Sequence, residues 1–152
     1  MVLTLHTFAK DDECQNLFDL PNLINLSLRL RKDHKDLKIL KGLKLQSLRL
    51  FGKKNRISQK TPSFDFPLLK GNTIKRVVIE NLNLSVGEPQ SIYFPLLEEL
   101  VLDGASIDQI CIFNVSSLKK IVIMNPTSDW PEMKSELRTL FENAEIIFVR
   151  SH

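Results

Sequence analysis

The chain has 152 residues, of which 43% are hydrophobic and 26% are charged. This length suits one domain with a substantial core, and the composition excludes a disordered or low-complexity protein. No stretch reaches the roughly 18 uninterrupted apolar residues of a membrane-spanning helix. Residues 1–10 lack the basic start and long apolar run of a secretory signal. The sequence therefore predicts one folded, soluble domain over residues 1–152.

The two cysteines, Cys14 and Cys111, are far apart in the chain. Cys111 lies in the apolar run 110–113, where a buried free thiol is the ordinary outcome. A reduced setting, cytoplasmic or nuclear, is therefore expected.

The net charge of +3 is unevenly distributed along the chain. Residues 1–76 carry 16 Lys and Arg against 7 Asp and Glu, a net of +9, whereas residues 77–152 carry 5 against 11, a net of −6. The chain is therefore polarised from a basic to an acidic half.

An apolar pattern, L-x-x-L-x-L, recurs along the chain. The full copies are Leu23-Leu26-Leu28, Leu45-Leu48-Leu50, Ile74-Val77-Ile79, Leu97-Leu100-Leu102 and Leu118-Ile121-Ile123, and partial copies are Leu3-Leu5 and Ile146-Phe148. The middle positions 26, 48, 77, 100 and 121 are separated by 22, 29, 23 and 21 residues, mostly within the 20–29 typical of leucine-rich repeats. Each copy predicts one short strand whose leucines point into the stack. The predicted fold is an α/β leucine-rich-repeat solenoid with one curved parallel sheet of about six or seven strands.

The segments that return from one strand to the next are expected to be irregular and to cover the convex side of the sheet. A short helix is plausible over 12–19, and the long return 51–73, which contains two prolines, is expected to loop outward. The clearest helix spans about 131–142. Asp129 can cap it, Pro131 suits its first turn, and apolar residues recur on one face.

Residues 94–107 and 115–123, with the patterns FPLLEELVLDGASI and VSSLKKIVI, resemble the irregular leucine-rich repeats of plant F-box proteins and of the C-terminal part of plant immune receptors. The resemblance implies recognition of a partner or substrate. The sequence shows neither a separate N-terminal helical F-box nor a G-x-x-x-x-G-K-[ST] nucleotide loop. The asparagine that many such families place three residues after the last strand leucine is replaced by Arg31, Lys53, Leu82, Ala105 and Pro126.

Leu3 and Leu5 are the second and third members of a triplet whose first member would precede Met1. Because solenoids need capped ends, this predicts a fragment of a larger protein that lacks its N-terminal cap. The alternative is that residues 1–5 form a short edge strand.

Polar residues are distributed by the repeat and do not gather in one catalytic constellation. His6, His34 and His152 are widely separated and fit no metal-ligand spacing. The adjacent acids Glu98 and Glu99 are better interpreted as a solvated patch than as a catalytic pair. We therefore expect no enzyme activity, no cofactor and no metal.

Side chains between the strand leucines would face the concave side of the sheet, where solenoids bind their partners. The predicted protein-binding residues are Arg29, Arg49, Phe51, Lys75, Arg76, Glu80, Glu98, Glu99, Asp103, Lys119 and Lys120. Their order is basic, acidic and basic again, which would give electrostatic complementarity to an unidentified protein partner. The alternative is that these charges only keep the surface soluble.

A second hypothesis is binding of nucleic acid or another polyanion through residues 29–60. This segment contains twelve Lys and Arg against two acids, enough to displace counterions from phosphates. Phe51 is its only aromatic residue, however, and no known nucleic-acid fold is apparent. The same charges could dock on an acidic protein or an anionic membrane surface.

Overall fold

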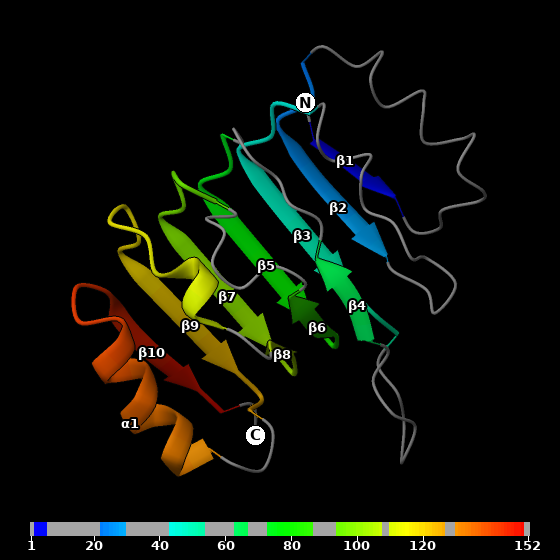
Figure 1. Cartoon of the computed structure of the whole chain (residues 1–152). Helices are drawn as coiled ribbons and strands as arrows, with labels where there is room; N and C mark the ends of the chain where they lie inside the picture. Colours follow the sequence, from blue (N-terminus) through cyan, green and yellow to red (C-terminus); the bar gives the residue numbers. More distant parts are fainter. Residues whose placement is uncertain are drawn as a thin grey trace.

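The computed structural model describes residues 2–5, 22–29, 43–53, 63–66, 73–86, 94–107, 110–126 and 130–150. Their main feature is a seven-stranded sheet in the order β1-β2-β3-β5-β7-β9-β10, in which every neighbouring pair is parallel (Figure 1). The strands are β1 (Val2–Leu5), β2 (Asn25–Arg29), β3 (Ser47–Phe51), β5 (Arg76–Glu80), β7 (Glu99–Asp103), β9 (Lys120–Met124) and β10 (Glu145–Val149). The prediction of a parallel-strand repeat solenoid is confirmed.

The register of the sheet follows the apolar triplets. Leu26 pairs with Leu48, Leu48 with Val77, and the same row continues through Leu100, Ile121 and Ile146. The partial copies obey the same rule, because Leu3 pairs with Leu26 and Phe148 with Ile123. Alternation along each strand then places this row and the row two residues later on one face of the sheet.

The hydrophobic core lies behind that face. The triplet residues from Leu23 to Ile123 are all buried, with exposed fractions between 0% and 4%. Phe94 and Phe113 fill the space between the sheet and the return segments, and their rings stack with centroids 5.7 Å apart and planes 4° from parallel. No single repeat encloses these side chains, so each repeat depends on its neighbours for stability.

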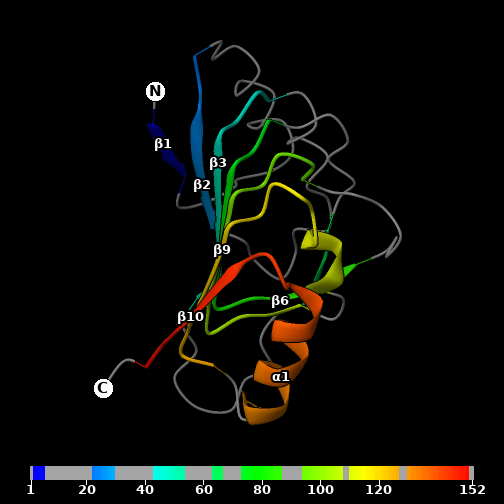
Figure 2. The same ribbon diagram turned by 90° about the vertical axis from the view of Figure 1, so that its left-hand side faces the viewer.

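Return segments form a second layer on one side of the sheet, as the edge-on view of Figure 2 shows for β6 and α1. This layer contains the small parallel sheet β4-β6-β8, made of β4 (Ser63–Phe66), β6 (Asn83–Val86) and β8 (Ser106–Ile107), and the 3-10 helix η3 (Ile110–Phe113). The sequence analysis did not predict the small sheet, and β4 lies within the return 51–73 that was expected to be a loop. The expected helix over 12–19 lies outside the described residues.

Helix α1 (Trp130–Leu140) confirms the predicted C-terminal helix to within two residues at its end. Leu137 and Phe141 are buried in the core and Leu140 is partly buried against it, as expected for one apolar face. Within the described residues, no helix is long and apolar enough to cross a membrane.

Strands β3, β5, β7 and β9 are each followed by a glycine or an asparagine at a recurring position. Two residues after the last triplet member lie Gly52, Asn81, Gly104 and Asn125, and the last three have φ of 51°, 55° and 47°. Glycine and asparagine tolerate this left-handed conformation better than other residues. Each of the four also donates its N–H to a carbonyl of the next strand, at 2.8 to 3.4 Å. The repeat thus places a glycine or an asparagine one position before the site at which many leucine-rich families have their asparagine.

Candidate binding surface

The face of the seven-stranded sheet opposite the described return segments is here called the open face. It carries the strand residues that alternate with the buried triplet residues. Because strand positions match from repeat to repeat, equivalent side chains form rows that cross the strands. This face corresponds to the one that the sequence analysis expected to bind a partner.

At the start of the strands, two consecutive N–H groups share one carbonyl of the preceding repeat. Lys75 and Arg76 both donate to the Gln46 carbonyl, at 2.8 and 3.1 Å, and Glu98 and Glu99 both donate to the Lys75 carbonyl, at 2.8 and 3.0 Å. The arrangement recurs one repeat later, where residues 119 and 120 donate to the Glu98 carbonyl. The two residues that precede the middle apolar residue of each triplet are therefore held side by side. Pairs from neighbouring repeats lie next to one another.

These pairs form a charge ladder, defined as Lys75, Arg76, Glu98, Glu99, Lys119 and Lys120. In one row, the Glu98 carboxylate lies 3.3 Å from Lys75 Nζ and 3.1 Å from Lys119 Nζ. In the other row, the Glu99 carboxylate lies 2.6 Å from Arg76 Nε and 3.8 Å from Lys120 Nζ. The structure thus brings together six predicted residues, and it shows that the acids of the central repeat bridge the cations on both sides. Four cations against two carboxylates leave a net charge of +2 on the ladder.

The pKa of Glu98 is lowered from its ordinary value, mainly by hydrogen bonding to Lys119 and then to Lys75, with their positive charges adding to the effect. A carboxyl whose pKa is lower in the folded chain than in the unfolded chain adds stability above the unfolded value, and that stability is lost as pH falls through the folded value. Because Glu98 is solvent-exposed, the ladder holds it ionised without making it a strong stabilising element.

We expect Lys119→Met to raise the pKa of Glu98 toward its ordinary value, because the mutation removes the larger of the two hydrogen-bonding partners. Carboxyl-carbon NMR titration of the wild type and the variant measures the shift directly. Lys120→Met is the matched control, since Lys120 pairs with Glu99 and should change the Glu98 titration less. An equal change in both variants would contradict the pairing.

A second cluster is formed by Arg49, Phe51 and Glu80, in the C-terminal halves of β3 and β5. Arg49 forms a bidentate ion pair with Glu80, with Nε–Oε1 at 3.0 Å and a second nitrogen-to-oxygen distance of 2.7 Å. The guanidinium carbon also lies 5.0 Å from the centroid of the Phe51 ring. Three predicted residues thus come together, and the bidentate pair and the ring restrict the orientation of the arginine.

The remaining predicted residues occupy the same strand ends in other repeats. Arg29 pairs in register with Phe51, and Asp103 pairs with Glu80. The Asp103 carboxylate accepts a hydrogen bond of 2.7 Å from Asn125 Nδ2. All eleven residues therefore lie on the predicted strands or directly before them, but they form separate groups.

An apolar patch on β9 and β10, formed by Val122, Met124, Ile147 and Val149, was not predicted from the sequence. In register, Val122 pairs with Ile147 and Met124 with Val149, so these residues form a two-by-two block. The block is partly exposed, with 39% of Val149 accessible. The signal was the alternation in residues 145–149, where Ile146 and Phe148 match the buried row and Ile147 and Val149 must face the other way.

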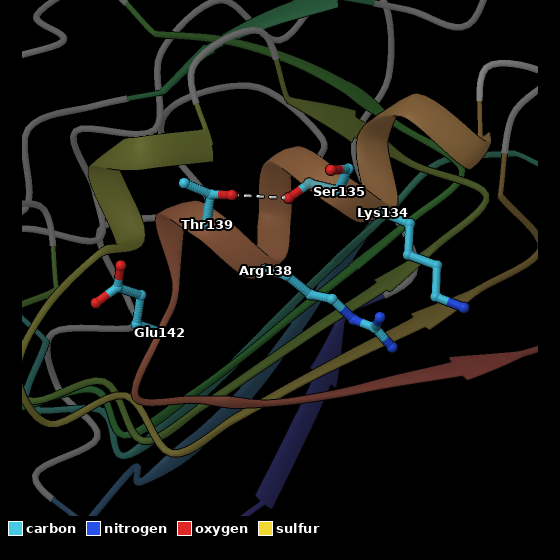
Figure 3. A pocket seen from close by; sticks show the side chains of 5 residues that line it. All are labelled: Lys134, Ser135, Arg138, Thr139 and Glu142. Atoms are coloured by element: carbon cyan, nitrogen blue, oxygen red, sulfur yellow. Dashed lines mark hydrogen bonds between the residues drawn. The ribbon is translucent and has the colours of Figure 1, made fainter.

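A pocket beside α1 is lined by Lys134, Ser135, Arg138, Thr139 and Glu142 (Figure 3). The Thr139 hydroxyl donates to the Ser135 carbonyl at 3.2 Å, which satisfies it within the helix. Within the part of the chain that the structure describes, no group of three or more His, Cys, Asp or Glu side chains could hold a metal ion.

No protein-family model matches this chain, and the searches of curated proteins and of solved structures give no match either.

Proposed function

We propose that this chain is a leucine-rich-repeat protein-interaction module that binds a protein partner on its open face. The observation that carries the proposal is the one-sided layering, in which β6, α1 and the other described return elements lie on a single side of the sheet (Figure 2). The other side presents rows of side chains from successive repeats. Such a regular surface is what repeat solenoids use to bind extended partners.

The mixture of chemistries on the open face favours a protein over a polyanion. Arginine and aromatic residues, which Arg49 and Phe51 place together here, are each enriched at protein interfaces. The apolar patch supplies area that a phosphate backbone would not contact. Glu98 and Glu99 also neutralise part of the basic charge that a polyanion would need.

Binding of a polyanion through residues 29–60 remains the second candidate, because this segment holds twelve Lys and Arg. Only Arg29, Lys44, Arg49 and Lys53 of this set lie among the described residues, and Arg49 is engaged by Glu80. The segment would act by charge alone, so its binding should decline steeply with salt. That property separates the two candidates experimentally.

The leucine-rich-repeat assignment rests on the repeat spacing and on the register of the apolar triplets. The resemblance of residues 94–107 and 115–123 to plant F-box and immune-receptor repeats supports a role in recognition within a larger intracellular protein. Because the polar groups are arranged by the repeat, we propose a binding role without catalysis.

The test is a pull-down from the native cell extract at low and high salt with the wild type and a Lys75→Glu, Arg76→Glu, Lys119→Glu, Lys120→Glu variant. We expect the variant to lose a protein that the wild type retains, because four reversed charges disrupt the charge ladder. Circular dichroism must show that the variant is folded. The control is Lys44→Glu, Lys53→Glu, which reverses two exposed cations outside the ladder.

Two results would overturn this proposal. One is retention of the same partner by both the wild type and the ladder variant. The other is capture, by both proteins, of nucleic acid that high salt removes, which would assign binding to residues 29–60.

A further inference from the structure

Strand β10 forms one edge of the seven-stranded sheet, and among the described strands it pairs with β9 alone. The backbone bonds at its two ends run toward β9, because Glu145 N–H donates to the Lys119 carbonyl and the Val149 carbonyl accepts from Asn125 N–H. In a parallel pair, alternate residues direct their backbone groups to opposite sides. The backbone N–H and C=O of Ile146 therefore point away from β9, toward the outer edge of the sheet.

The two faces of the sheet differ chemically beside this edge. On the open face lies the apolar patch, which ends at Ile147 and Val149. On the opposite face lies α1, where Lys134 Nζ is 5.2 Å from the centroid of the Phe148 ring. Arg138, one helical turn further on, extends in the same direction (Figure 3). The β10 edge is therefore apolar on one side and cationic on the other.

We propose that the β10 edge binds an extended segment of a partner protein in which apolar and acidic residues alternate. Successive side chains of an added strand point to opposite faces of the sheet. The apolar side chains of the partner would extend the apolar patch beside Ile147 and Val149. Its acidic side chains would lie on the opposite face and contact Lys134 and Arg138 near α1. The inference deepens the proposed function and rests on it, because it specifies the chemistry of a partner and the place where it binds.

A second copy of this chain fits the edge less well. If β10 of another molecule paired here, its Ile146 and Phe148 would occupy the face that holds Lys134 and Arg138, and the cations would meet apolar side chains. The centre of β10, residues 146–148, contains no acidic side chain that could pair with Lys134 or Arg138. Self-association is therefore an alternative that the experiment must detect.

The probes are two capped hexapeptides, one alternating valine with glutamate and one alternating valine with lysine. They are titrated into the full isotope-labelled chain, and backbone amide shifts are followed by NMR. We expect the glutamate peptide to shift the amides of residues 145–149 and to bind about tenfold more tightly than the lysine peptide, because two favourable ion pairs replace two repulsive contacts. Absence of shifts up to millimolar concentrations, or equal affinity of the two peptides, would overturn the proposal.

N-methylated versions of the glutamate peptide test strand pairing itself. Methyl groups on the alternate residues that face β10 should abolish binding, whereas methyl groups on the other set should not. Equal effects of both sets would show that the peptide does not add as a strand. Light scattering of the free chain completes the test, since dimers that an Ile147→Lys variant disperses would assign the edge to a second copy.

A Lys134→Glu, Arg138→Glu variant should reverse the preference, so that the lysine peptide binds more tightly. Lys44→Glu, Lys53→Glu is again the control and should keep the preference for glutamate. Failure of the peptide experiments together with loss of the native partner by the charge-ladder variant would reject the edge site alone. Loss of peptide binding in the charge-ladder variant would instead place the peptide on that ladder and overturn the edge site.

Discussion

Replacing Gly52 with alanine is expected to lower the free energy of unfolding by about 3 kcal/mol, the upper end of the usual cost of overpacking. A Cβ at this position would lie 2.4 Å from the Asn81 carbonyl oxygen and 2.8 Å from Leu82 Cδ2. The Gly52 N–H also donates to the Glu80 carbonyl at 2.8 Å, so the chain cannot move away without losing this bond. Because the closest atom belongs to the backbone, β3 and β5 must separate. Urea denaturation followed by circular dichroism measures the effect.

Gly104→Ala is the matched control, because Gly104 has the equivalent position two repeats later. Here the nearest atom to an added Cβ is the side-chain Oδ1 of Asn81, at 3.0 Å, and a side chain can move. The left-handed φ of 55° remains a cost of about 1–2 kcal/mol for alanine. Gly104→Asn should cost less, since asparagine already adopts this conformation at positions 81 and 125. Equal destabilisation by Gly52→Ala and Gly104→Ala would show that the close backbone contact is unimportant.

Phe113→Ala should destabilise the chain by about 3–5 kcal/mol, the range typical of a buried phenylalanine. Phe113 and Phe94 are both fully buried, and their stacked rings join the return segments of two successive repeats. The change leaves a cavity that the neighbouring strands, fixed by their ladder bonds, cannot fill. Chemical denaturation of Phe113→Ala, Phe94→Ala and the double variant measures both the loss of unfolding free energy and the coupling between the two rings.

The loss of unfolding free energy in the double variant should be about 0.5–1.5 kcal/mol smaller than the sum of the losses in the two single variants. Each single variant already removes the contact between the two rings, so the sum counts this contact twice. Leu96→Ala provides the control, since 48% of Leu96 is exposed and it adjoins the same loop. Its cost should stay below about 0.5 kcal/mol. Strict additivity of the two phenylalanine variants would show that the rings do not stabilise each other.

The large sheet could be predicted because one physical signal repeats many times. Each strand is marked by apolar residues at fixed spacing, and a shift by one residue would expose them all, so the register between Leu48 and Val77 follows from the pattern. The small sheet β4-β6-β8 gives no such signal. Its strands have two to four residues, and segments such as Asn83–Val86 combine polar and apolar residues without a repeat that identifies them.

The sequence predicted which residues lie on the candidate surface, but not how their side chains interact. Lys75, Glu98 and Lys119 were predicted to lie between the strand leucines of successive repeats and to face a partner. That Glu98 bridges the other two depends on side-chain directions across strands, which the linear spacing does not contain. The apolar patch was not predicted, although the alternation at Ile147 and Val149 is present in the sequence.

The shared carbonyls at the strand starts have a consequence for how such a surface can change over evolution. Each repeat bonds to the next through the same backbone groups, whatever side chains it carries, as the bonds of residues 75, 98 and 119 show. Duplication or deletion of one repeat would therefore lengthen or shorten every row by one strand, about 4.8 Å, without altering the geometry on either side. A gene encoding this chain can thus vary the width of its open face independently of the chemistry of each row.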